Sequence, residues 1–239
     1  MQEAENQVMR TVNDLMAFIQ KRGYEPGERL PSERDLTERF SVGRGVIREA
    51  LTFLEASRYI ERKRNSGIYL TDGMDQVSLE ALVLYSKVNI PFDRRTIMDC
   101  MEVRKILEVQ AIALACKRRT EADIETLRQN LRDTRETIEA GGSIAERDFE
   151  FHMAVFRAAQ NDIFTRVVTP FYLMSRNRRE DFFRDPKRGD ASLAQHTAIT
   201  AAIEARNVDL AVELMDRHIG RVEDHYLVSM GDASPAGTS

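Results

Sequence analysis

Apolar residues recur at helical spacing through the first part of the chain. The segment 4–22 predicts a helix, because its apolar residues fall on one face: Val8, Val12, Leu15, Met16 and Ile19. Two prolines and two glycines then interrupt the pattern at 23–31. Ser32 stands where it would cap a second, short helix, and a third helix is predicted at about 44–56 after a tight turn.

A short hairpin is predicted after the third helix. Residues 58–70, RYIERKRNSGIYL, indicate two strands around a tip formed by Asn65, Ser66 and Gly67, residue types that tolerate left-handed backbone. Three helices followed by a hairpin are typical of a winged helix-turn-helix. We therefore expect this domain to span residues 1–72.

The rest of the chain predicts a bundle of helices. Helical spacing extends over seven segments: 78–89, 95–118, 120–140, 144–160, 162–183, 190–205 and 208–229. The expected breaks lie at Pro91, 140–142, 186–190 and Asn207. The fold class is therefore mainly α, with a linker at 73–77, an all-helical bundle of six or seven helices at 78–230 and a disordered tail at 231–239.

Composition places the protein among soluble globular chains. Hydrophobic residues make up 42% and charged residues 31% of 239 residues. No apolar run approaches the roughly 20 residues that span a bilayer, and the polar amino terminus does not resemble a secretory signal. Cys100 and Cys116 would lie about 24 Å apart on one helix, too far for a disulfide. We expect a cytoplasmic protein with reduced thiols and no membrane association.

Charge is distributed unevenly along the chain. Residues 29–64 contain nine basic and six acidic residues, although the whole chain carries a net charge of −4. A basic segment in an acidic protein favours an anionic partner for that segment alone. Solvated charged surfaces are common, so charge alone indicates nucleic acid only weakly.

Arginines at the start of the third predicted helix are suited to reading DNA. In a helix-turn-helix, the first residues of the second motif helix meet base edges in the major groove. Arg44 and Arg48 lie one turn apart there, and Arg34 precedes the turn. A guanidinium can donate two hydrogen bonds to guanine. The alternative is that Arg34 and Arg48 form surface salt bridges with Glu38 and Glu49.

The segment 26–70 resembles the DNA-binding domain of the GntR family of bacterial transcription regulators. The resemblance is carried by PGERLPSERDL and RGVIREAL. It implies a homodimer that binds a double-stranded DNA operator through Arg34, Arg44, Gly45 and Arg48, with the tip Asn65, Ser66 and Gly67 near the minor groove. Family members usually have serine or threonine on both sides of the arginine at position 44. Here both neighbours are glycine, which removes hydroxyls that usually contact phosphates.

Three of the four histidines lie on apolar helical stripes of the second half. Asp148 and His152 share one helix face, and His196 and His218 lie on two further predicted helices. One buried histidine satisfied by a neighbour would be ordinary, but each unpartnered imidazole would cost about 1–3 kcal/mol. One divalent cation would satisfy all four side chains: zinc first, with nickel, iron or manganese as alternatives. His225 lies about 10 Å beyond His218 along its helix and cannot share that ion.

Arg104 is the second unexpected polar residue on an apolar stripe. A guanidinium on a buried face requires an anion. The anion could belong to a carboxylate side chain on a neighbouring helix. The alternative is a small-molecule carboxylate held between the cation and Arg104.

The second half resembles the ligand-binding FCD domain of the FadR-type branch of the GntR family. Four segments match its signature regions in order: 102–115, 148–161, 192–203 and 211–219. The resemblance implies that Asp148, His152, His196 and His218 bind a metal ion and that Arg104 contacts an effector. The acyl-CoA-binding member of the branch lacks this metal set, so a small organic acid is favoured here.

The sequence therefore predicts a metabolite-responsive transcription regulator rather than an enzyme. We expect a repressor that binds an inverted-repeat operator as a homodimer and senses a sugar acid, hydroxy acid or dicarboxylate through a metal-containing pocket. One rival is a metal sensor, in which the ion itself is the signal. The other rival is a metal-dependent hydrolase, against which no independent general base is found and the DNA-binding half would be unexplained.

Overall fold

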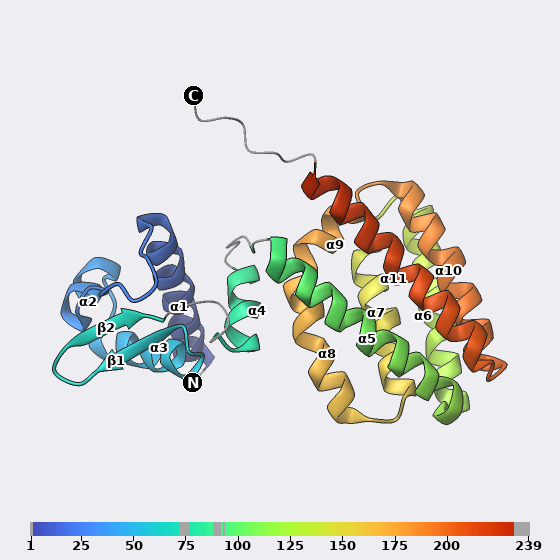
Figure 1. The fold of residues 1–239 in the computed structure, drawn as a ribbon, viewed down its shortest axis with the longest axis horizontal. Coiled ribbons are helices and arrows are strands. Elements are labelled where there is room, and N and C mark those ends of the chain that lie inside the picture. Colours follow the sequence, from blue (N-terminus) through green and yellow to red (C-terminus); the bar gives the residue numbers. More distant parts are fainter. Residues whose placement is uncertain (1, 72–76, 88–91, 93, 232–239) are drawn as a thin grey trace. The chain divides into compact units, whose positions relative to one another are not determined.

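The computed structural model describes residues 2–71, 77–87, 92 and 94–231 (Figure 1). The chain divides into two compact units, Met1–Phe92 and Asp93–Ser239. Most of the predicted linker and of the predicted tail lies outside the described residues, as does the expected break at Pro91. Within the described part, no helix combines the length and the apolar character needed to cross a membrane.

The first unit contains the predicted winged helix-turn-helix. Its elements are α1 (Gln2–Arg22), α2 (Glu33–Phe40), α3 (Arg44–Ala56), β1 (Ile60–Lys63) and β2 (Gly67–Leu70). Ser32 begins α2 with a capping box, in which its hydroxyl accepts from the Asp35 amide while the Asp35 carboxylate accepts from the Ser32 amide. The apolar face of α1 packs on α3, with Leu15, Met16 and Ile47 almost completely buried. This core holds α3 in place and leaves its first turn exposed.

The hairpin pairs β1 with β2 in antiparallel register, from Ile60 opposite Leu70 to Lys63 opposite Gly67. Asn65 has φ 58° and Gly67 has φ 140°, so the tip uses the left-handed backbone that its residue types predicted. The segment before α2 also joins this sheet edge, through an isolated bridge between Arg29 and Tyr69 and through backbone hydrogen bonds of residues 27–30 to β2.

The next helix, α4 (Leu79–Lys87), belongs to the first unit, whereas the sequence analysis placed it in the bundle. The Ser78 amide donates to the Ser57 carbonyl, and the rings of Tyr59 and Tyr85 pack edge to face 5.3 Å apart. Apolar periodicity shows that a segment is helical, but it does not show which core receives the helix. The structure begins the second unit at residue 93 instead of 78.

Seven helices form the second unit among the residues described, in agreement with the predicted six or seven: α5 (Arg94–Arg118), α6 (Glu121–Glu139), α7 (Ala145–Ala158), α8 (Asp162–Met174), α9 (Arg176–Phe182), α10 (Pro186–Glu204) and α11 (Val208–Gly231). Helices α5 and α11 lie side by side, and α7 packs against α5 and α6 (Figure 1). Nine side chains of α7 are buried, which makes it the central helix.

Two helix boundaries in this unit differ from the predictions. The single helix expected at 162–183 is divided at Ser175 into α8 and α9. The expected break at 186–190 is instead the first turn of α10, because Asp185 caps the helix and Pro186 occupies its first position. Proline is favoured there, since the first turn needs no amide donor.

Candidate functional site

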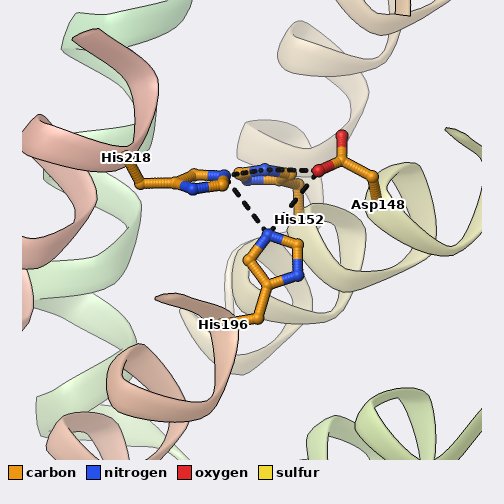
Figure 2. Close-up of side chains that lie close together, drawn as sticks. All are labelled: Asp148, His152, His196 and His218. Carbon is orange, nitrogen blue, oxygen red and sulfur yellow. Dashed lines mark hydrogen bonds and ion pairs between the residues drawn. The ribbon is translucent and has the colours of Figure 1, made fainter. Parts of the chain in front are cut away.

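Four side chains from three helices of the bundle meet at one point. Asp148 and His152 lie one turn apart on α7, His196 comes from α10 and His218 from α11. Figure 2 shows the three imidazoles and the carboxylate pointing toward a common centre. One ligand atom of each residue lies within 4.8 Å of the others. The structure thus brings together all four residues that the sequence singled out as a metal-binding set.

The spacing of the four side chains suits one small cation. His218 Nε2 lies 3.2 Å from the Nε2 atoms of both His152 and His196. Asp148 Oδ1 lies 3.6 Å from His196 Nε2 and 3.9 Å from His152 Nε2. Tetrahedral ligands about 2.0–2.1 Å from zinc stand roughly 3.3–3.4 Å apart, close to these separations. Three nitrogen lone pairs aimed at one another repel, and a cation between them removes that repulsion.

Burial keeps two of the imidazoles, those of His196 and His218, in the neutral state that binds metal. All three histidines are at most 1% exposed, and Asp148 is 5% exposed. Burial, reinforced by the neighbouring imidazoles, holds the pKa of His196 and of His218 well below the usual value. Both are therefore neutral near pH 7, as metal ligands must be.

Neighbouring side chains orient two of the three rings. The Nδ1 atom of His152 lies 3.1 Å from the Glu108 carboxylate, and that of His218 lies 2.7 Å from Gln195 Oε1. With Nδ1 as the donor in each bond, Nε2 keeps its lone pair for the shared centre. The ring of His196 is held differently, by stacking on Phe151 at a centroid distance of 3.7 Å.

Sequence analysis missed Glu108, which is fully buried behind His152. Besides His152, its carboxylate accepts a hydrogen bond from the Tyr172 hydroxyl and pairs with Arg104 one turn away on α5. Burial pushes the pKa of Glu108 upward, but His152 and Arg104 outweigh it and lower that pKa. The i, i+4 spacing to Arg104 was a signal available in the sequence.

Arg104 lies beside the four-residue cluster but has partners of its own. Its Nε is 3.5 Å from Glu108 Oε1, its Nη2 donates to the Tyr172 hydroxyl at 2.8 Å, and the guanidinium lies over the Tyr172 ring. The sequence allowed a carboxylate on a neighbouring helix as the partner of Arg104. In the structure the partner is Glu108, which lies on the same helix. Arg104 also lines a cavity that reaches Asp148 and His218.

This cavity contains about 30 Å³ of open volume, roughly the space of one water molecule in the liquid. Arg104, Asp148 and His218 line it, and so do Arg178 and Arg179 of α9. Burial lowers the pKa of both α9 guanidinium groups. Sequence analysis missed both arginines, because the run RNRRED has the composition of a solvated surface. The remaining walls are mainly aromatic and aliphatic: Phe182, Phe183, Val222 and Tyr226.

The arginines expected to contact DNA lie on the surface of the first unit. Arg44 begins α3 and is exposed. Arg48 pairs with Glu33 at 2.9 Å rather than with Glu49, and Arg34 lies 3.9 Å from Asp35 rather than pairing with Glu38. Arg34 and Arg48 therefore do form surface salt bridges, as the alternative interpretation predicted, but with Asp35 and Glu33 as their partners.

The smaller residues expected at the DNA surface lie in open positions. A Cβ atom added at Gly45 would meet nothing within 4 Å, so no packing requirement explains this glycine inside α3. Asn65 and Ser66 are exposed at the hairpin tip, where the hydroxyls of Ser66 and Tyr69 lie 2.6 Å apart. His225, which the sequence excluded from the metal set, lies beside Arg188 and Phe182.

Comparison with known proteins agrees with both halves of the structure. The family model for bacterial regulatory proteins of the gntR family matches residues 8–70, and the model for the FCD domain matches residues 99–221, more than half of the chain. The chain belongs to the GntR family. It is a regulator of the branch that joins a GntR DNA-binding domain to an FCD domain, and its relatives are transcription regulators rather than enzymes.

Relatives match this regulator over most of its length. The HTH-type transcriptional regulator LutR of Bacillus subtilis is 34% identical over 209 residues, which cover 84% of this chain and 92% of the relative. The galactonate operon transcriptional repressor of Escherichia coli is 28% identical, covering 86% of this chain and 90% of the relative. Among solved structures, Streptococcus agalactiae GntR has a TM-score of 0.50 at 27% identity, covering 91% of this chain and 99% of the other.

Proposed function

We propose that this GntR-family regulator is a metabolite-responsive repressor, which binds an inverted-repeat operator as a homodimer and senses a small organic acid through a metal-containing pocket. The observation that carries the proposal is the convergence of Asp148, His152, His196 and His218 beside a cavity lined by guanidinium groups. A cation and several arginines around one cavity form a binding site for an anion.

The DNA-binding part of the proposal rests on the exposed first turn of α3. Arg44 and Arg48 are available to base edges and phosphates, and the hairpin tip supplies Asn65, Ser66 and Gly67. In a homodimer, two such units related by a two-fold axis would contact half-sites one helical turn apart, so the operator should be an inverted repeat. The name of the E. coli galactonate operon repressor supports repression as the outcome.

The proposed metal is zinc, one ion per chain. Three imidazoles and one carboxylate are ligands that zinc prefers, and the separations of 3.2–3.6 Å between His218 and the other two histidines and between His196 and Asp148 are close to those of a tetrahedral site. Nickel, iron and manganese accept similar donors. When bound, the cation would offer a positive centre to a carboxylate of the effector. Glu108 and Gln195 would hold the rings of His152 and His218 in the required orientation.

The small volume of the cavity suggests how an effector acts. An organic acid needs more than the 30 Å³ present, so binding must move side chains or helices apart. A ligand shifts a conformational equilibrium only through its different affinities for the two states. An acid that binds more tightly to a wider cavity would therefore stabilise the helix arrangement in which the cavity is wide. That arrangement of the bundle would in turn determine the affinity for DNA.

Two measurements on the full-length protein test the proposal. DNA selected from a random library should contain an inverted repeat, and a thermal-shift screen of organic acids should find stabilisation that disappears after chelation and returns with zinc. Selection of DNA sites without an inverted repeat would contradict operator binding by a two-fold symmetric homodimer. If zinc without any acid changes affinity for the selected DNA and no acid does, the protein is a metal sensor instead.

A further inference from the structure

Arg178 differs from the other two arginines of the cavity. Arg104 pairs with Glu108, and Arg179 donates to the Ala145 and Tyr172 carbonyls while it packs over the Phe149 ring. Among the described residues, no carboxylate lies within ion-pairing distance of Arg178, although this arginine lines the cavity. A half-buried cation without an anion is an unfavourable arrangement unless a ligand completes it.

The charges around the cavity also favour an anionic ligand. Three arginines line the cavity together with one carboxylate, that of Asp148, and Glu108 neutralises Arg104 from outside the lining, which leaves one net positive charge among these five groups. A divalent cation at the histidines would raise this to three. The pKa of Arg178 is lowered by burial and also by the positive charge of Arg104, so the like charges oppose each other inside the protein. One carboxylate would neutralise only part of this excess.

We propose that Arg178 forms a second anion subsite and that the effector is therefore a dicarboxylate, a hydroxy dicarboxylate being the best match. This inference rests on the proposed function. One carboxylate and its α-hydroxyl lie near Asp148, His218 and Arg104. The second carboxylate pairs with Arg178.

The surroundings of Arg178 make this subsite selective. A guanidinium binds a carboxylate through two parallel hydrogen bonds, and the apolar walls at Phe182, Phe183 and Val222 limit access of competing water. A monocarboxylate would leave Arg178 desolvated and unpaired, which is how a polar subsite rejects a ligand that lacks the matching group. Arg178 is also a long and only half-buried side chain, so it can shift outward to admit a ligand larger than the present cavity.

Matched pairs of acids test the subsite on the zinc-loaded full-length protein. L-Lactate and L-malate share an α-hydroxy carboxylate and differ by one carboxylate, as do 2-hydroxybutyrate and 2-hydroxyglutarate. Their affinities are measured by isothermal titration calorimetry for the wild type and for Arg178→Gln, Arg178→Lys and Arg176→Gln. Arg176 is the matched control, because it lies on the same helix with its side chain 65% exposed and pairs with Glu180.

The wild type is expected to bind the diacid of at least one pair about tenfold to a hundredfold more tightly than its monoacid, the usual effect of one charge-assisted hydrogen bond. Arg178→Gln should remove that difference and leave monoacid affinity unchanged. Arg178→Lys, which keeps the charge, should retain part of it, and Arg176→Gln should retain all of it.

Other results overturn the inference in distinguishable ways. If the monoacids bind as tightly as the diacids, or if Arg178→Gln weakens both equally, the second subsite is wrong and the proposed acid sensor stands. If the protein binds zinc but neither member of either pair, the hydroxy-dicarboxylate subsite is wrong, and the proposed acid-sensing function fails with it only if the thermal-shift screen also finds no stabilising acid.

Discussion

Arg48 in the first unit and Arg104 in the bundle each pair with a glutamate, but in opposite environments. The side chains of Arg48 and Glu33 are 69% and 38% exposed, whereas those of Arg104 and Glu108 are 12% and 0% exposed. Water screens the first pair, so DNA can replace Glu33 as the partner of Arg48 at little expense. The second pair lies in a low-dielectric interior, where the loss or exchange of a partner changes the free energy strongly.

This difference separates the two tasks that a regulator performs. Side chains that are proposed to read DNA need to be available, and α3 presents its arginines on a surface whose fold depends on apolar contacts elsewhere. Side chains that are proposed to detect a small molecule need to be prearranged, and α5, α7, α10 and α11 fix theirs by packing. Substitutions in the first unit should therefore change DNA binding alone, and those in the bundle should change ligand and metal binding.

The largest expected effect is the loss of a metal ligand. His196→Ala should lower zinc affinity by more than about 100-fold, because losing only a hydrogen-bonding partner of a ligand already costs about 10–100-fold. Competition with a chromophoric chelator measures this affinity. His225→Ala is the matched control, since this histidine lies outside the cluster. Equal losses in the two variants, or none in either, would remove the metal centre from the account.

Glu108→Gln should weaken zinc binding by about 10–100-fold through a residue that does not contact the ion. The amide keeps the size of the side chain but loses the charge that orients His152 and pairs with Arg104. The same competition assay applies, with Glu102→Gln as an exposed control on the same helix. Unchanged zinc affinity in Glu108→Gln would show that His152 does not depend on this carboxylate.

In the first unit, Arg44→Ala should reduce affinity for selected DNA by about tenfold, the typical value of one arginine contact to a base. Zinc affinity and the melting temperature should not change, because Arg44 is exposed. Gel-shift titration at fixed salt measures the effect. Arg132→Ala removes the same charge from the exposed face of α6 and serves as the control. Similar losses in both variants would mean that only overall charge matters.

A further expected effect is a loss of stability of the zinc-free protein in mild acid. Burial holds the pKa of His196 and His218 well below 6.5, so the unfolded chain takes up protons that the folded chain does not. Their contribution is complete above about pH 6.5 and declines as the pH falls, by about 1 kcal/mol per imidazole at pH 6. Urea unfolding at pH 7.5 and pH 6 measures it. Higher stability at pH 6 would contradict the assignment of buried, neutral imidazoles.

The four side chains that meet in the bundle could be singled out from the sequence because their signal was local. A polar residue on an apolar stripe is visible from helical spacing alone, and Asp148 with His152, then His196 and His218, each gave that signal. The winged helix was equally predictable, since Ser32 is a residue type that caps a helix and the hairpin tip has residue types that tolerate left-handed backbone.

Features that depend on tertiary packing could not be predicted in this way. Arg178 and Arg179 belong to a charged run that resembles solvent-exposed helix, and only the fold of α9 turns them toward the cavity. The unit that receives α4 follows from contacts such as Tyr59 with Tyr85, which spacing does not reveal. The start of α10 depends on Asp185 as a cap, whereas the sequence predicted a break in the helical pattern at 186–190.

Anomalous diffraction at the zinc absorption edge, from crystals of the zinc-loaded full-length protein, tests the central claim most directly. The account predicts one strong peak per chain in the bundle, about 2.0–2.2 Å from Nε2 of His152, His196 and His218 and from a carboxylate oxygen of Asp148. A bundle without such a peak, or with the ion held by other residues, would contradict it.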